Sequence, residues 1–336
     1  MARLPRAYLS GEQARAVGMV EGLHLRLMQF AVYRGAVALG RRLGLTGARF
    51  VIGVPYLWLL LFFLLPFLIV AAISVATPNL DLAPPFSFDA FANGAIRLAK
   101  ALENYLSVLG DDLYVAAFLS SLRIAAISTA LALAIGYPLA YGIARAPDGW
   151  RAPLLMLVIL PFWTSFLIRI YAWIGILGET GLLNQLLQGL GLIDQPLILL
   201  GTEWAVYFGI VYAYLPFMVL PLYAALEKMD LSLLEAAADL GARPFKAFLT
   251  VTLPLSLPGV LAGCMLVFIP AVGEFVIPDL LGGSDTLMIG KVLWDEFFQN
   301  GNWPMASTVA IVMLAVLVLP IVFVHWLRAR QTGAET

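Results

Sequence analysis

The sequence has little of what most metal sites are built from. Its 336 residues include one cysteine, Cys264, and two histidines, His24 and His325. A single cysteine cannot form an intrachain disulfide, and a cluster of cysteine and histidine ligands around a metal ion is excluded. We expect this chain to bind no metal and no cofactor of its own.

Motifs of common hydrolases and nucleotide-binding proteins are also missing. The sequence contains no G-x-S-x-G elbow and no H-E-x-x-H pair, and Asp285 stands where a Walker A loop ending in Gly290-Lys291 needs its first glycine. We therefore expect no catalytic residues, and any ATP and Mg²⁺ used in its function would be bound by a partner ATPase. Nothing in the sequence indicates binding to nucleic acid.

Charge is scarce and apolar residues are abundant. Charged residues make up 12% of the chain and hydrophobic residues 62%. A soluble domain of this size does not need so much apolar surface, which predicts an all-α, polytopic protein of the lipid bilayer. Six apolar runs form a transmembrane domain over residues 51–330, at 51–76, 115–144, 153–177, 203–226, 258–277 and 305–326.

The first 50 residues differ from this pattern because they contain eight arginines and only two acids, Glu12 and Glu21. Apolar residues between the arginines favour a basic amphipathic helix on the cytoplasmic face of the membrane, with a solvated basic tail as the alternative. We expect no cleavable signal peptide.

Basic residues also predict the orientation. Fifteen lysines and arginines fall on the side of the two termini, and three fall on the other side, namely Arg97, Lys100 and Lys291. The positive-inside rule then places both termini and the loop at 230–256 in the cytoplasm.

That loop is predicted to be a helical corner. Ser232 and Glu235 have capping-box spacing at the start of a helix, and Gly241 would end the helix in a left-handed conformation. Pro244 suits the first turn of a second short helix. Pro254 and Pro258 are expected to break this second helix before the next span.

The same loop resembles the EAA loop of ABC importer permeases, with Glu235-Ala236-Ala237, then Gly241, then Leu253-Pro254 at the family's spacing. The resemblance implies a bacterial inner-membrane subunit with the six-helix type I permease fold, in which these six residues couple to an ATPase. It also implies three partners: a second homologous permease, a homodimeric cytoplasmic ATPase and a periplasmic substrate-binding protein.

A second segment bears on the cargo. Residues 273–283, GEFVIPDLLGG, and 288–294, MIGKVLW, resemble the permeases of spermidine and putrescine importers, and most of all a putrescine-type member with a long N-terminal extension. A permease for another solute, such as ferric iron, a phosphonate or an amino-acid derivative, is an alternative. A stand-alone secondary transporter is another, although it would be expected to show internal repeats.

A cationic cargo would need acids and aromatic rings along its path. Glu274 lies near the outer end of a span, where an ionisable residue usually faces a pathway; an interfacial acid is the alternative. Arg123 and Arg169 would repel a cation and are expected to pair with acids or to reach the membrane surface. The further pathway candidates are the acids Asp279 and Glu179 and the aromatic residues Tyr171, Trp173 and Trp294, which also suit an interfacial belt.

Overall fold

The computed structural model describes residues 47–88, 98–284 and 286–332, with side chains described for 52–88, 102–284 and 286–318. The basic surface helix was predicted within the first 50 residues. Residues 1–46 lie outside the described residues, and residues 47–50 belong to the first described helix. The chain forms two compact units, Met1–Ile69 and Val70–Thr336.

The described part of the first unit is one apolar helix. Helix α3, Gly47–Leu59, continues through a π-turn, Leu60–Leu64, into α4, Leu65–Ser74, and the boundary between the two units falls within α4. The π-turn comes directly before Pro66, whose missing N–H would otherwise interrupt the helix. The stretch Ile52–Ser74 is long and apolar enough to cross a membrane.

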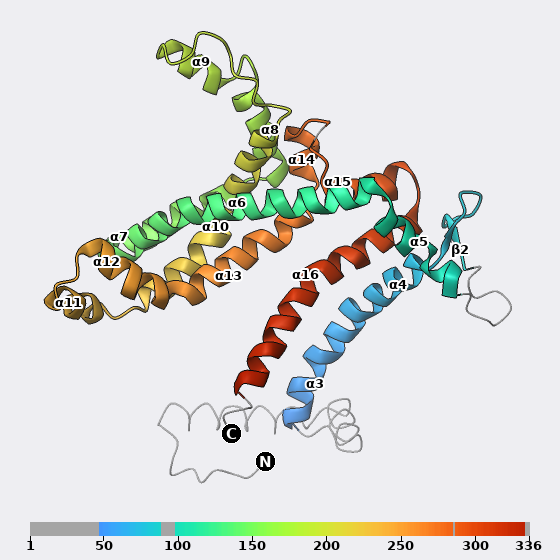
Figure 1. The fold of residues 1–336 in the computed structure, drawn as a ribbon, viewed down its shortest axis with the longest axis horizontal. Coiled ribbons are helices and arrows are strands. Elements are labelled where there is room, and N and C mark those ends of the chain that lie inside the picture. The colour runs from blue at the N-terminus through green and yellow to red at the C-terminus, as the bar shows by residue number, and fades with distance from the viewer. Residues whose placement is uncertain (1–46, 89–97, 285, 333–336) are drawn as a thin grey trace, which may run out of the picture. The chain divides into compact units, whose positions relative to one another are not determined.

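The centre of the second unit is a bundle of three long helices, α6 (Asp112–Arg145), α10 (Glu203–Glu227) and α13 (Leu253–Val272), which lie side by side in Figure 1. Packing rather than the hydrophobic effect holds helices together in lipid, so small residues matter at their contacts. A methyl group added to Gly263 would lie 2.8 Å from Met218 Sδ, and one added to Gly259 would lie 2.8 Å from the Pro221 carbonyl oxygen.

Shorter elements surround this bundle. Two residues from each of β1 and β2 pair antiparallel, with Thr77 opposite Ser87. The remaining elements are β1 Thr77–Pro78, β2 Phe86–Ser87, α5 Leu98–Gly110, α7 Asp148–Ile159, α8 Phe166–Leu177, α9 Leu182–Gly189, α11 Ser232–Asp239, α12 Pro244–Ala247, α14 Val276–Leu281, α15 Ile289–Trp294 and α16 Trp303–Thr332, with a 3-10 turn at Leu160–Trp163 and π-turns at Phe248–Thr252 and Asp295–Gln299.

The predicted all-α membrane fold is confirmed. Five helical stretches are long and apolar enough to cross a membrane, and α16 adds a shorter apolar stretch, Trp303–Val318, among the residues with described side chains. The predicted spans at 115–144 and 203–226 correspond to α6 and α10, with ends shifted by three residues or fewer.

The third predicted span, 153–177, is not one helix. Helix α7 ends at Ile159, a 3-10 turn follows, and α8 begins only at Phe166 after an extended Thr164. Pro161 lacks an N–H for the helix, and the Thr164 hydroxyl donates to its carbonyl oxygen (2.8 Å). The stretch long enough to cross a membrane runs instead from Phe166 to Gly189, so it includes the short helix α9.

The fifth span also differs from its prediction. Helix α12, the π-turn and α13 follow one another without a break from Pro244 to Val272, so Pro254 and Pro258 do not end the helix. The π-turn directly precedes Pro254 and widens the helix where an N–H is missing. Helix α13 then ends at Val272, and the residues up to 277 belong to the break at 273–275 and to α14.

Candidate functional site

The corner between α10 and α13 begins with an aspartate that sequence reasoning did not single out. The backbone N–H of Ser232 donates to Asp230 Oδ1 (3.0 Å), and hydrogen bonds from Ser232 hold the pKa of Asp230 below its usual value. The predicted capping box is wrong. Leu231 is already in a helical conformation (φ −68°, ψ −26°), which places Ser232 inside the helix rather than at its cap.

Gly241 ends α11 as predicted. Its φ is +80°, in the left-handed region, and its N–H donates to the Ala238 carbonyl (2.8 Å). The N–H of Ala242 donates to the Ala237 carbonyl (3.0 Å), which closes a Schellman-type end. Pro244 then starts α12, so a helix, a glycine corner and a second helix follow one another as the sequence indicated.

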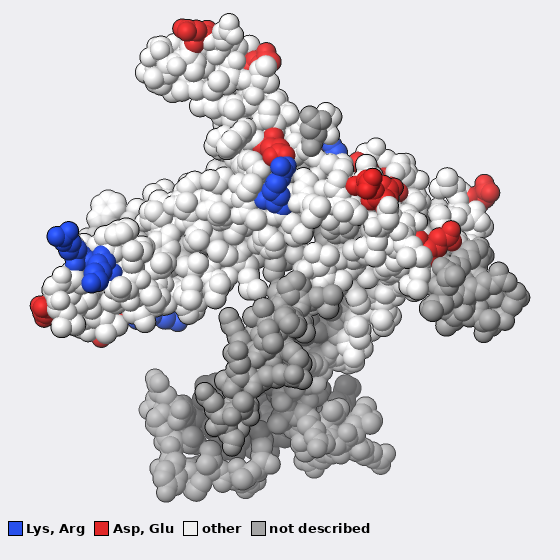
Figure 2. Space-filling view, in the orientation of Figure 1, with Lys and Arg blue, Asp and Glu red and all other residues white. Residues whose placement is uncertain are grey.

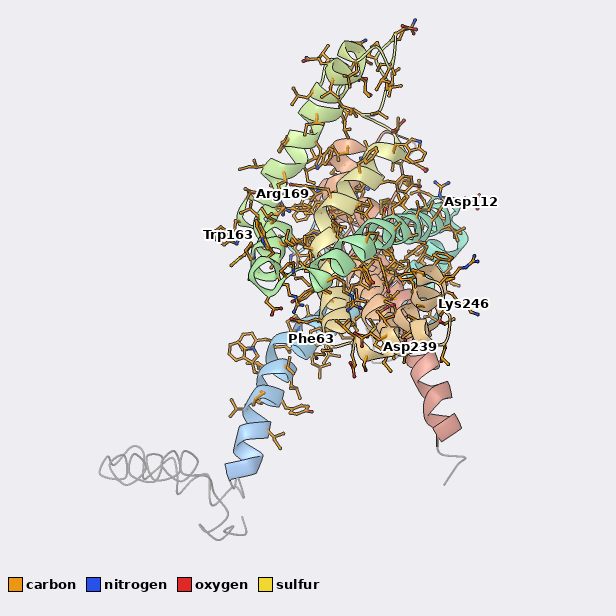
Figure 3. All side chains as sticks on the ribbon, turned by 90° about the vertical axis from the view of Figure 1, so that its left-hand side faces the viewer. Phe63, Asp112, Trp163, Arg169, Asp239 and Lys246 are labelled. Atoms are coloured by element: carbon orange, nitrogen blue, oxygen red, sulfur yellow. The ribbon has the colours of Figure 1, made fainter. Side chains whose placement is uncertain are left out.

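The surface of the corner combines small, charged and large apolar side chains. Glu235 and Ala236 are exposed, Ala237 is half-buried, and Figure 3 labels Asp239 and Lys246 at this end of the bundle. Leu240 and Phe245 are 89% and 72% exposed and were missed by sequence reasoning, although a leucine and a phenylalanine in a polar loop are a readable signal. They give the corner two apolar contact points.

The remaining motif residues tie this corner to the bundle. Leu253 is half-buried against the core and Pro254 is exposed, both in the first turn of α13. One turn earlier, the Phe248 ring packs edge-on against Tyr137 of α6, with 5.5 Å between centroids. The Tyr137 hydroxyl shares a hydrogen bond with Ser256 Oγ (2.8 Å), so the helix that leaves the corner is fixed to α6.

A second site forms where two helices are broken. Residues 160–165 interrupt the helices α7 and α8, residues 273–275 interrupt α13 and α14, and the unbroken helix α10 lies between them. They enclose a groove of about 480 Å³. Its lining is largely aromatic and consists of Phe162, Phe166, Ala213, Tyr214, Phe217, Pro270, Gly273, Glu274, Phe275 and Val276.

Glu274 is the one charged residue of this lining and is 7% exposed. The Tyr214 hydroxyl donates to its Oε2 (2.5 Å), and the backbone N–H groups of Val276 (3.1 Å) and Ile277 (3.5 Å) donate to its Oε1. The carboxylate therefore holds the start of α14 and faces an apolar groove. Tyr214 was missed by sequence reasoning because it is 60 residues away in the chain.

The structure brings only some of the other predicted pathway residues close to Glu274. The Trp294 ring stacks on Phe275 at 4.3 Å, directly beside Glu274, whereas Asp279 forms an ion pair with Lys291 (3.0 Å). Trp173 packs against Tyr212 outside the groove lining. Tyr171 and Glu179 are exposed and do not line the groove.

The two membrane arginines are in different surroundings. Arg123 pairs with an acid, as expected from the sequence; its partner is Glu203, which also accepts a hydrogen bond from Tyr207 (3.1 Å). The Arg169 guanidinium lies over the rings of Phe162 and Phe166.

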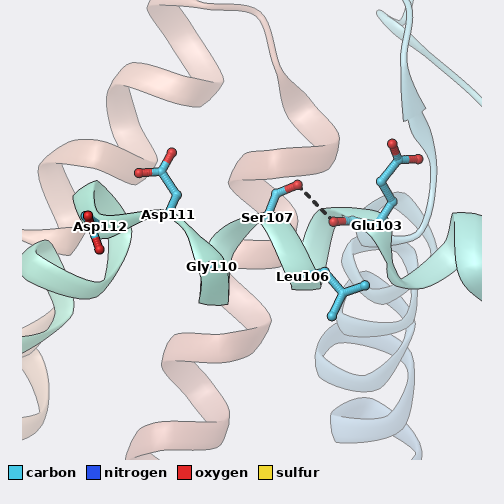
Figure 4. Close-up of a pocket in the computed structure, with 6 residues that line it drawn as sticks. All are labelled: Glu103, Leu106, Ser107, Gly110, Asp111 and Asp112. Carbon is cyan, nitrogen blue, oxygen red and sulfur yellow. Dashed lines mark hydrogen bonds between the residues drawn. The ribbon is translucent and has the colours of Figure 1, made fainter.

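An acidic concavity of about 770 Å³ lies at the start of α6 (Figure 4). It is lined by Glu103, Leu106, Ser107, Gly110, Asp111 and Asp112. Asp111 accepts the N–H of Leu113 (2.8 Å) and so caps α6. Among the residues that the structure describes, no group of three or more His, Cys, Asp or Glu side chains is arranged to hold a metal ion.

A family model described as "Binding-protein-dependent transport system inner membrane component" matches residues 31–332. The chain belongs to this family. The predicted assignment to the permeases of ABC importers is thereby confirmed, and the corner at 230–256 lies within the matched region.

Two curated relatives and one solved structure resemble this permease. The spermidine/putrescine transport system permease protein PotB of Haemophilus influenzae is 42% identical over 278 residues, which cover 83% of this chain and 92% of the relative. PotB of Escherichia coli is 41% identical over 273 residues, covering 81% and 94%. A crystal structure of a bacterial ABC transporter involved in alginate import matches with a TM-score of 0.63 and 17% identity, over 87% of this chain and 99% of the other. That structural match bears on the fold alone.

Proposed function

We propose that this permease carries polyamines such as putrescine and spermidine across the bacterial inner membrane. Relatives more than 40% identical over most of the chain are named for the transport of these two compounds. Both are cationic at neutral pH, since alkyl ammonium groups titrate near pH 10. The proposal thus requires a place in the membrane part of the chain that accepts a cation.

The observation that carries the proposal is the buried carboxylate of Glu274 in an aromatic groove. An acid in a membrane span costs about 2.5–3.5 kcal/mol on insertion scales, so it is retained where it has a partner or a function. The C-terminal end of α13 adds partial negative charge beside it. The rings of Phe162, Phe166 and Phe217 offer faces for ammonium groups, each contact contributing roughly 0.5–2 kcal/mol.

The corner would transmit the driving force for transport from an ATPase to the membrane helices. We propose that Leu240 and Phe245 insert into a cleft of a separate, homodimeric ATPase that binds ATP and Mg²⁺, while Gly241 keeps α11 and α12 at a fixed angle. The helix that follows runs unbroken into α13, so a displacement of the corner would move this span. This chain would then need no ATPase site of its own.

Charge supports an orientation with the corner and both termini in the cytoplasm. Figure 2 shows basic side chains near α12 and acidic ones at the opposite end of the bundle, near α5 and α15. Basic loops are retained on the cytoplasmic side. A periplasmic substrate-binding protein would then dock at the acidic end, and a second homologous permease would complete the pathway between the two subunits.

Replacing Glu274 by glutamine tests the proposal. Glutamine keeps the shape, its oxygen accepts the N–H groups of Val276 and Ile277, and its amide nitrogen can donate to the Tyr214 hydroxyl. Because the charge is removed, polyamine uptake by the assembled complex in proteoliposomes should fall at least about tenfold. Glu227→Gln is the matched control, because Glu227 also accepts a tyrosine hydroxyl on α10 (Tyr223, 2.7 Å) but is exposed. Unchanged uptake in the Glu274 variant, at equal protein levels, would remove the groove from the proposed pathway.

A permease for an anionic solute is the alternative that one observation favours, because Arg169 lies beside the groove. To separate the two cargo classes, uptake of radiolabelled putrescine is measured with an excess of either spermidine or a phosphonate. Competition by spermidine alone supports a polyamine cargo, and competition by the phosphonate alone supports the anion.

A further inference from the structure

Arg169 is a positive charge at the edge of the groove that pairs with no acid among the described side chains. Its guanidinium carbon lies 5.3 Å from the ring centroid of Phe162 and 5.7 Å from that of Phe166, and both rings line the groove. Its Nε is buried and has no hydrogen-bond partner. None of the ion pairs between described side chains includes Arg169.

Two of these three residues belong to one helix. Phe166 and Arg169 lie three residues apart in α8 and share one of its faces, and Phe162 belongs to the 3-10 turn that precedes the extended Thr164. The arginine therefore reaches back over the two rings that precede it, on the helix shown in Figure 3. Its position depends on these rings rather than on an acid, in contrast to Arg123 and its partner Glu203.

A cation that lies over aromatic rings and is not paired with an acid is costly to keep inside a membrane protein. Cation–π contacts offset part of the desolvation but do not neutralise the charge. The nearest carboxylate of the groove lining, Glu274, is engaged by Tyr214 and two backbone N–H groups. The Arg169 guanidinium thus lies over two rings that also line the groove.

We propose that Arg169 is a tethered cation that sets how readily a cation enters the groove. The inference rests on the proposed function, in which the cargo is an amine. An entering ammonium group competes with the guanidinium for Phe162 and Phe166 and is repelled by its charge, so the side chain withdraws when a cargo binds. A small monovalent ion gains less from rings and acid than a polyamine with several ammonium groups, which makes Arg169 a determinant of cargo selectivity.

The test measures the electrostatic potential of the groove without any cargo. In the assembled complex with Cys264→Ser, a thiol is introduced by Phe217→Cys, at a groove residue that is 39% exposed. Its modification rates by a cationic and an anionic methanethiosulfonate reagent are compared. Arg169→Gln should raise the cationic-to-anionic rate ratio about tenfold, because one unit charge near the thiol is removed.

Two controls separate charge from structure. Arg169→Lys keeps the charge and should leave the rate ratio within about twofold of the parent. Arg145→Gln is the matched control: Arg145 also has a buried, unpartnered nitrogen and lies 5.2 Å from a tyrosine ring, but at the corner end of α6. If Arg169→Gln does not assemble, Arg169→Met replaces it, since it keeps the length of the apolar stem.

The outcomes for Arg169 and for the cargo are independent. An unchanged rate ratio in Arg169→Gln, or an unreactive thiol in every variant, overturns the role of Arg169 whatever the cargo is. Uptake then adds a second readout: Arg169→Gln should still take up putrescine and should admit monovalent alkylamines that the parent excludes. Loss of putrescine uptake in this variant also overturns the inference, whereas a parent complex that takes up no polyamine overturns the proposed function alone.

Discussion

The corner and the groove are built on opposite principles. The turn between α11 and α12 is closed by backbone hydrogen bonds between residues at most five apart, such as Ala242 to Ala237, and it exposes Leu240 and Phe245. The groove is assembled from three separate segments, and the bond between Tyr214 and Glu274 spans 60 residues. Backbone shape therefore matters most in the corner, where substitutions should act on docking of the ATPase. Charge matters most in the groove, where substitutions should act on the cargo.

The largest effect is expected from Gly241→Val. The position has a φ of +80°, which a β-branched residue adopts at a cost of at least 1–2 kcal/mol. No atom lies within 4 Å of an added Cβ, so the cost is conformational rather than a clash. Uptake in membrane vesicles should be abolished, and the ATPase should no longer co-purify, while the permease remains in the membrane. Gly241→Asn, which tolerates this conformation, should retain much of the activity; equal loss in both variants would contradict the conformational explanation.

A smaller effect is expected when the two exposed apolar residues of the corner are made polar. Burial of a leucine or phenylalanine contributes about 1.5–3 kcal/mol, so Leu240→Ser with Phe245→Ser should weaken ATPase binding at least about tenfold. The measurement is the dissociation constant of the permease complex and the ATPase by surface plasmon resonance. Leu190→Ser is the control, since Leu190 directly follows α9, is 65% exposed and lies outside the corner. Equal affinities for all variants would show that Leu240 and Phe245 do not take part in ATPase docking.

The role of the groove is tested by Tyr214→Phe, which removes only the hydrogen bond to Glu274. One such bond to a charged group contributes about 1.5–3 kcal/mol, and part of this is retained through the two backbone donors. Polyamine uptake should fall a few-fold without a change in ATPase binding. Tyr223→Phe, which removes the same kind of bond to exposed Glu227, should change neither. A Tyr214 variant that loses the ATPase instead would show that the two regions are not separable.

The same contrast explains what could be predicted from the sequence. Gly241 and Pro244 were predicted because their conformations are set by their own chemistry and immediate neighbours. The predicted capping box was wrong by one residue. Leu231 already has a helical conformation, so α11 includes Ser232, which was predicted to be its cap. Pro254 was expected to break a helix, but a π-turn precedes it, and its residues, Phe248–Thr252, carry no sequence signal for such a turn.

The groove was only partly predictable for a related reason. Glu274 stood out as an acid in an apolar run, but no local pattern pairs it with Tyr214 of another helix. The run 153–177 was interpreted as one span because its residues are apolar throughout. The 3-10 turn contains Phe162 and Trp163, which are as apolar as the helices around them, so hydropathy does not reveal the break. Helix breaks and long-range contacts depend on tertiary packing, which a single sequence does not specify.

The smallest effect is expected at Asp230, where the corner depends on one titratable group. Hydrogen bonds from Ser232 lower the pKa of this exposed carboxylate. Because the folded-state pKa lies below the unfolded value, the contribution to stability is complete above the ordinary aspartate pKa and is lost as pH falls through the lowered one. Hydrogen exchange, corrected for its intrinsic pH dependence, should therefore show the first amides of α11 losing protection only in strongly acidic buffer. Asp230→Asn keeps an uncharged acceptor and should show no such loss, because its capping does not titrate. A pH-dependent loss of equal size in Asp230→Asn would assign the fraying of the corner to another group.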